Sequence, residues 1–144
     1  MTEYATPSRT LNPLTPTGYF RVSSILLAAV GVLGLVLAAL GQTRLLAFDH
    51  DAGHAGFLTL TLTHSIVHLV LAAVAGLLGF GSLAPRVVRP LAITIGAVYA
   101  GLGVLGFFVA DPLGGALSLS LGLGGNLVHL LLGGLGLVAG LRGE

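Results

Sequence analysis

The segments Ser65-Ile66-Val67-His68-Leu69-Val70-Leu71 and Asn126-Leu127-Val128-His129-Leu130-Leu131-Leu132 are near copies of each other, 61 residues apart. Each places one histidine inside a long run without charged residues. Ionisable side chains are rare at bilayer depth, where they usually face another helix, a cavity or a ligand. The two segments therefore indicate membrane helices, and their histidines mark where a site would lie.

The composition is that of a membrane protein. Of the 144 residues, 55% are hydrophobic and 8% are charged, against roughly 25% charged in a soluble domain. The chain has no cysteine, which excludes disulfides and thiolate metal sites. Its net charge of +1 gives no field for nucleic acid, so the lipid bilayer is the expected partner.

Charged residues and prolines divide the chain into four apolar segments, each able to supply the roughly 20 residues that cross a bilayer. We expect an all-α fold, a bundle of four transmembrane helices, because a helix satisfies its backbone hydrogen bonds within one segment. The expected helices are residues 20–40, 57–83, 90–110 and 117–141, in a transmembrane domain of residues 18–144. Residues 1–17 are expected to form a mobile tail, and residues 85–90, which begin and end with proline, a tight turn.

The arginines predict the orientation. Five of them flank one side of the expected bundle: Arg9, Arg21, Arg86, Arg89 and Arg142. Only Arg44 stands on the other side. Because positively charged residues gather on the cytoplasmic side of membrane proteins, both termini are expected in the cytoplasm.

Two halves of the chain resemble each other. Sliding residues 60–79 by 61 positions gives identities at Leu60, Leu62, Val67, His68, Leu69, Leu71 and Gly79. The first and third expected helices also share Gly-Val-Leu-Gly, at residues 31–34 and 103–106, at a different spacing. The pattern predicts a parallel internal duplication of two plus two helices.

Helical spacing predicts where the histidines point. His64 and His68 share one face with Ala72, Ala75 and Gly79, and His129 shares one with Gly125, Gly133, Gly136 and Gly140. Small residues mark the faces on which membrane helices pack. At about 1.5 Å per residue from Phe57, His68 would lie about 16 Å along its helix, and His129 at a similar depth near the middle.

The favoured interpretation of these residues is structural. His68 and His129 would hydrogen-bond to each other or to a polar seam of His64, Ser65 and Asn126. The protein would then have a structural or accessory role, packing with itself or with a larger membrane complex through its glycine and histidine helix faces. No cofactor and no enzymatic chemistry are expected under this interpretation.

The alternative is a b-type haem-binding electron-transfer protein with His68 and His129 as axial ligands. Three further interpretations have less support from the sequence. A metal site of His64, His68 and His129, near Asn126, has suitable spacing but no acidic residue in the helices. A proton relay through the same histidines, or a channel or transporter, would ordinarily include embedded charge.

The elements Ser65-x-x-His68 and Asn126-x-x-His129, each followed by a Leu- and Gly-rich helix, resemble a family of small bacterial four-helix membrane proteins, a domain of unknown function. The resemblance covers about Gly18 to Leu141 and is most specific over residues 126–133. Ser65 departs from it, since the family pattern would have Asn there. The resemblance implies the fold and a multi-pass location in the bacterial cytoplasmic (inner) membrane, and it implies no activity.

Overall fold

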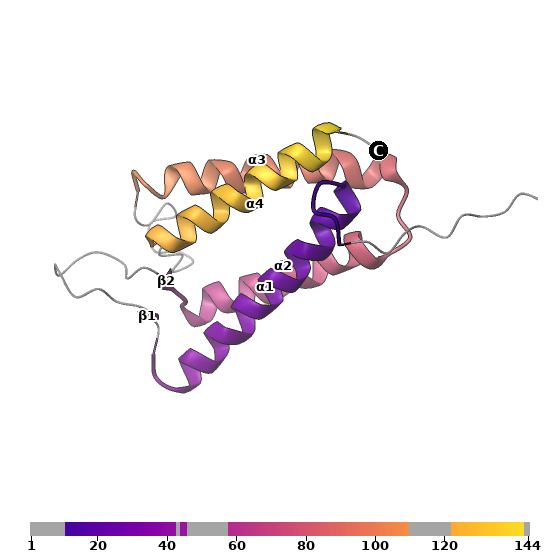
Figure 1. Ribbon diagram of the computed structural model, residues 1–144. Helices are drawn as coiled ribbons and strands as arrows, with labels where there is room; N and C mark the ends of the chain where they lie inside the picture. The colour runs from indigo at the N-terminus through magenta and orange to yellow at the C-terminus, as the bar shows by residue number, and fades with distance from the viewer. Residues whose placement is uncertain (1–10, 43, 46–57, 110–121, 143–144) are drawn as a thin grey trace, which may run out of the picture.

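The computed structural model describes residues 11–42, 44–45, 58–109 and 122–142, which form four α-helices and one short strand pair (Figure 1). The helices are α1 (Pro16–Ala39), α2 (Leu62–Phe80), α3 (Pro85–Leu105) and α4 (Leu123–Arg142). With 24, 19, 21 and 20 residues, each is long and apolar enough to cross a membrane. The predicted all-α architecture of four membrane-spanning helices is confirmed.

The helix α1 begins before its predicted start at residue 20, because two capping signals precede it. Pro16 occupies the first helical position, where its missing N–H would have had no partner anyway. The Thr15 hydroxyl accepts a hydrogen bond from the Gly18 N–H at 3.1 Å, which satisfies one exposed donor of the first turn. Of the predicted tail, residues 1–10 lie outside the described residues.

The helix α2 begins at Leu62 rather than at residue 57. The Thr61 hydroxyl caps it by accepting from the His64 N–H at 3.1 Å. Before the cap, β2 (Leu58–Thr59) pairs antiparallel with β1 (Arg44–Leu45), a strand pair that was not predicted. Apolar runs of this length do not by themselves distinguish helix from strand.

The start of α2 at Leu62 changes where the histidines lie along their helices. His68 is the seventh residue of α2, and His129 is the seventh residue of α4. Both lie about 9 Å from the start of their helices, at the same position along each. They lie nearer to the N-terminal ends of their helices than the predicted position near the middle.

The predicted turn over residues 85–90 is wrong, because these residues form the start of α3. Pro85 takes the first helical position after Ala84, a favoured place for proline. Pro90 lies inside the helix and offers no N–H to the carbonyl of Arg86. The connection from α2 is residues 81–84, and α3 ends at Leu105, before the predicted residue 110. For α4, predicted as 117–141, residues 117–121 lie outside the described part of the chain.

The helices form two hairpins, α1 with α2 and α3 with α4 (Figure 1). Glycines bring the helices of the first hairpin into close contact. A Cβ added at Gly34 would overlap the side chain of Ser65, and one at Gly31 would lie 2.7 Å from Cγ of Leu69. Residues with side chains at either position would force α1 and α2 apart.

The second hairpin repeats these contacts. A Cβ at Gly106 would overlap the side chain of Asn126, and one at Gly103 would lie 2.7 Å from Cγ of Leu130. Asn126 and Leu130 follow Ser65 and Leu69 by the same 61 residues that separate the histidines. The two hairpins therefore pack through matched residues.

Bulky side chains fill the space between the hairpins at the end where the described chain begins and ends. Tyr19 and Phe20 are both buried there, with 1% of their surface exposed. They form one core cluster with Ala75, Val88, Ala92 and Ala139. The cluster joins all four helices at this end.

Two arginines close the same end of the hairpins. Arg21 Nε donates to the carbonyl of Gly79 at 2.7 Å, and Arg89 Nε donates to the carbonyl of Gly140 at 2.8 Å. Carbonyls in the last turn of a helix have no partner within the helix, so each arginine satisfies one of them from the neighbouring helix.

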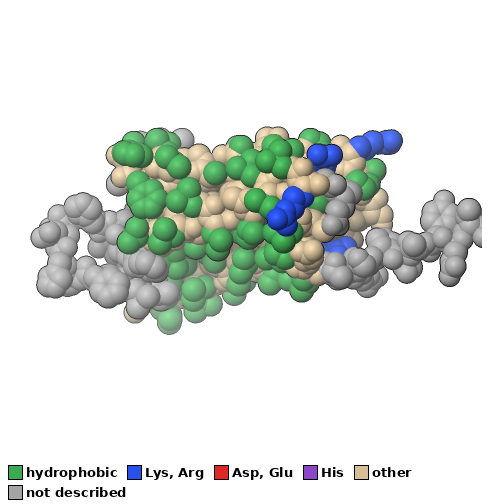
Figure 2. Space-filling model, turned by 45° about the horizontal axis from the view of Figure 1, so that its top comes forward, with side chains coloured by type: hydrophobic (Ala, Val, Ile, Leu, Met, Phe, Trp, Pro, Cys, Tyr) green, Lys and Arg blue, Asp and Glu red, His purple; other side chains and the backbone are tan. Residues whose placement is uncertain are grey.

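The outer surface is largely hydrophobic, with arginines near one end (Figure 2). Large apolar side chains on it are strongly exposed, among them Leu77 at 72% and Phe108 at 82%. Such a surface is unfavourable in water and suits contact with lipid. Together with the four helices of spanning length, it identifies a multi-pass membrane protein.

The glycine contacts lead to a prediction that a matched pair on α3 tests. In Gly96→Ala, the new Cβ would lie 2.6 Å from the Leu137 nitrogen, a backbone atom that cannot rotate away. We expect the free energy of unfolding to fall by about 1–3 kcal/mol, the usual cost of overpacking. In Gly101→Ala, nothing lies within 4 Å of the new Cβ, and the variant should be at least as stable as the parent. Thermal unfolding in detergent, followed by circular dichroism, measures both, and equal midpoints would contradict the close approach of α3 and α4.

Candidate metal centre

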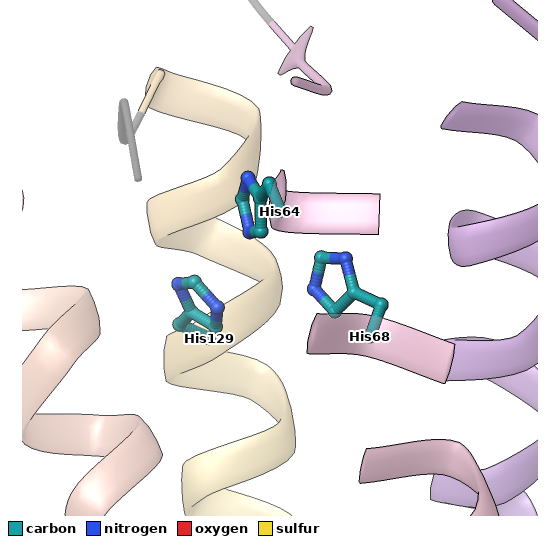
Figure 3. Close-up of side chains that lie close together, drawn as sticks. All are labelled: His64, His68 and His129. Carbon is teal, nitrogen blue, oxygen red and sulfur yellow. The ribbon is translucent and has the colours of Figure 1, made fainter. Parts of the chain in front are cut away.

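Three histidines from two helices meet in the interior of the bundle. His64 and His68 come from α2 and His129 from α4, and their side chains converge (Figure 3). One ring nitrogen from each lies within 4.8 Å of the others. All three side chains are buried, with 6–8% of their surface exposed. The predicted meeting of His68 and His129 is confirmed, and His64 joins them.

Local structure fixes the two histidines of α2. They stand one turn apart, and their rings stack with centroids 4.4 Å apart and planes 25° apart. The Thr61 cap fixes the start of this turn, and the Ser65 hydroxyl donates to the Thr61 carbonyl at 2.7 Å. Leu58 and Thr59 of β2 line the same cavity as His64, so β2 borders the cluster.

On the other hairpin, an aromatic side chain flanks the third histidine. Tyr99 of α3 lies beside His129, with ring centroids 5.4 Å apart and planes 38° apart. Tyr99 is itself buried, at 8% exposed. Tyr99 was not predicted to lie here, because a single tyrosine in an apolar helix gives no distinctive signal in the sequence.

The predicted polar seam separates into two parts. His64 belongs to the cluster, whereas Ser65 faces α1 at Gly34 and Asn126 faces α3 at Gly106. Ser65 and Asn126 each precede a histidine by three residues, and both are almost fully buried, at 0% and 2% exposed. They therefore lie in the seams within the hairpins, while the histidines lie between the hairpins.

A cavity of about 90 Å³ adjoins the cluster. Apart from the three histidines, its walls include two hydroxyl side chains, Thr59 and Tyr99, and are otherwise apolar or glycine. The remaining lining residues are Leu26, Leu27, Val30, Leu58, Leu60, Gly122, Gly125, Val128 and Leu132. We call this space the histidine chamber.

The polar atoms of the histidine chamber lack partners. The Nδ1 atoms of all three histidines and the hydroxyls of Thr59 and Tyr99 are buried, and none has a hydrogen-bond partner within the described part of the chain. A buried polar atom left unpaired costs about 1–3 kcal/mol. Five such atoms around one cavity are typical of a site that holds a polar ligand or ion.

The donor set suits a transition metal. Neutral imidazoles are good ligands for zinc, copper, nickel and iron. A tetrahedral zinc ion with bonds of about 2.0–2.1 Å holds its donors about 3.4 Å apart. In the structure, one nitrogen from each of the three rings lies within 4.8 Å of the others. Modest rotations of the rings would bring these nitrogens to the spacing that zinc requires.

Comparison with known protein families, with curated proteins and with solved structures finds no match to this chain.

The orphaned nitrogens lead to a prediction for the metal-free protein. The double variant His68→Leu/His129→Leu removes two buried Nδ1 atoms that have no partner among the described residues, and it keeps similar side-chain volume. In the presence of a chelator, we expect its midpoint of thermal unfolding to equal or exceed that of the parent. If the histidines hold the helices together by hydrogen bonds, the midpoint will instead fall. Leu132→Ala serves as a sensitivity control, because Leu132 lies in the chamber wall and is only 2% exposed. Its free energy of unfolding should fall by about 2–5 kcal/mol.

Proposed function

We propose that this protein is a four-helix membrane protein that binds one divalent transition-metal ion through His64, His68 and His129. The observation that carries the proposal is the convergence of three buried imidazoles, with one nitrogen of each within 4.8 Å of the others. Their Nδ1 atoms have no hydrogen-bond partner among the described residues. The proposal concerns binding and includes no enzymatic step.

Both hairpins contribute ligands, so the ion would join them. His64 and His68 bind from one helix at the spacing of one turn, and His129 binds from the other hairpin. In the structure, the hairpins are joined at the opposite end by the cluster around Tyr19 and Phe20. A metal at the histidine chamber would supply the corresponding link at this end. We therefore expect metal binding to raise the stability of the whole bundle.

The role expected from the sequence, a structural or accessory protein that packs with itself or with a larger membrane complex, is the competing proposal. It is supported by the glycine contacts of each hairpin. It does not explain why the Nδ1 atoms of the three histidines are buried without a partner among the described residues, and for that reason we rank it second.

Haem remains a third proposal, since His68 and His129 face each other across the two hairpins. A porphyrin between them would need the space that His64 now fills, because His64 lies within 4.8 Å of both through one ring nitrogen. The cavity of about 90 Å³ is also far below the roughly 300–1,000 Å³ of pockets for larger ligands. Haem binding would require the hairpins to separate.

We also propose that the two hairpins arose by internal duplication and that both termini lie in the cytoplasm of a bacterium. Support for the duplication comes from the matched contacts of Gly34 with Ser65 and Gly106 with Asn126. Support for the orientation comes from the arginines near one end of the bundle (Figure 2). The histidine chamber would then lie toward the outer side of the cytoplasmic membrane.

Metal binding is tested on protein purified without a polyhistidine tag. In a His50→Ala/His54→Ala background, the three cluster histidines are the only ones in the chain. We expect one Co²⁺ or Zn²⁺ per chain, and His64→Ala, His68→Ala or His129→Ala should each weaken binding at least 10-fold. At a metal concentration 100 times Kd, stability should rise by about 2.7 kcal/mol. Elemental analysis after dialysis and thermal unfolding provide the readouts.

The metal proposal would be overturned if the parent protein retains no metal after dialysis and added metal does not shift its unfolding midpoint. A visible haem spectrum in the parent that is lost in His129→Ala would favour the haem protein instead. If the parent protein holds neither metal nor haem, the structural role becomes the better proposal.

Orientation is tested with single cysteines, because the chain has none of its own. Gln42 and Ser82 are both exposed and follow α1 and α2, at opposite ends of the bundle. A membrane-impermeant maleimide added to intact spheroplasts should label Gln42→Cys and should label Ser82→Cys only after lysis. The reverse pattern would show the termini to be outside.

A further inference from the structure

The described part of the chain offers three ligands in the histidine chamber, one fewer than a tetrahedral ion takes. The described residues contain no Asp, Glu or Cys, and no histidine other than the three of the cluster. Asn126 is directed to Gly106 of α3 rather than to the chamber. A tetrahedral ion held by these described residues alone would keep one position open, as catalytic zinc sites do and closed structural sites do not.

The charge of the ion also remains unbalanced. Three neutral imidazoles leave a divalent cation with its full charge, in a chamber whose walls are otherwise mostly apolar. An isolated charge in such surroundings is strongly unfavourable unless a counter-charge accompanies it. No carboxylate among the described residues balances this charge, and an anion bound to the ion would do so.

The chamber has room and hydrogen-bond donors for such a ligand. A cavity of about 90 Å³ accommodates a few water-sized groups, since one water takes about 30 Å³ in the liquid. The hydroxyls of Tyr99 and Thr59 line this cavity and have no hydrogen-bond partner among the described residues. A hydroxyl beside a metal-bound anion would donate to it, and hydrogen bonds to charged groups are the stronger ones.

From these three observations we infer that the metal centre is a binding site for a small exchangeable anion, which takes the open position of the ion and accepts a hydrogen bond from Tyr99. This inference rests on the proposed metal binding. Tyr99 acts as a positioning and selectivity residue and is not itself a ligand of the ion. The chamber admits anions of a few atoms and excludes bulky ones.

The test uses the protein loaded with Co²⁺, whose visible absorption reports the ligands and geometry of the ion. Sodium azide, titrated at constant ionic strength, should change the spectrum with saturation at one azide per metal. Tyr99→Phe should weaken azide binding about 10-fold, the value of one hydrogen bond to a charged group, and leave the affinity for Co²⁺ unchanged. Tyr19→Phe is the matched control. It removes the hydroxyl of another buried tyrosine, outside the chamber lining, and should bind azide like the parent.

The outcomes separate the two proposals. If Co²⁺ binds and azide leaves the spectrum unchanged, the inference is overturned while the metal proposal stands. The inference also fails if Tyr99→Phe abolishes Co²⁺ binding, because Tyr99 would then be the fourth ligand and the site closed. An equal loss of azide affinity in Tyr19→Phe would remove the role assigned to Tyr99. If the parent binds no Co²⁺, both proposals fall together.

Discussion

Direct contact between helix backbones at glycine is the constraint on which the structure depends. In a bilayer, apolar side chains gain little by leaving lipid for the protein interior, so helices associate where their surfaces fit closely. Gly34 against Ser65 and Gly106 against Asn126 provide such contacts, one in each hairpin. A polar side chain therefore sits against a bare backbone where the helices cross, and the faces that carry the histidines are left to meet the other hairpin.

The space between the hairpins is filled differently at its two ends. Near the described termini, the rings of Tyr19 and Phe20 occupy it together with small residues of the other helices. At the other end the side chains are imidazoles, and a cavity remains beside them. If these side chains served only to pack the helices, leucine would stabilise the bundle more than histidine, because it has no nitrogen to leave unpaired. The difference between the two ends is the reason for assigning function to the histidines and not to the aromatic cluster.

The sequence predicts much of this arrangement because its signals are local. Length and hydropathy suffice for four spanning helices, and the three- to four-residue spacing of His64, His68, Ala72, Ala75 and Gly79 correctly predicts one buried face. The same spacing in α4 holds except at Gly125, which is only partly buried. Helix starts were less predictable, because capping by Thr15 and Thr61 and a proline at the first position of α3 depend on single residues within continuous apolar runs.

The composition of the candidate site was harder to predict than its position, for a physical reason. Which side chains surround His68 and His129 depends on how the two hairpins pack, and no periodicity within one helix contains that information. The same limit explains why Tyr99 and Thr59 were missed and why Ser65 and Asn126 were expected beside the histidines. In each case the residue's position in the sequence does not say which residues of a neighbouring element it contacts.

A metal centre held by the three histidines alone would have a consequence for a protein that must enter a bilayer. Neutral imidazoles can be inserted and buried at a lower cost than ionised Asp or Glu, so the bundle can form before any ion is present. The remaining cost is the unpaired nitrogens, and binding of an ion would relieve it. The charge then arrives with the ion rather than with the chain. An anion drawn in with it would keep the buried complex close to neutral, and the affinities for ion and anion would rise together, because each ligand improves the site for the other.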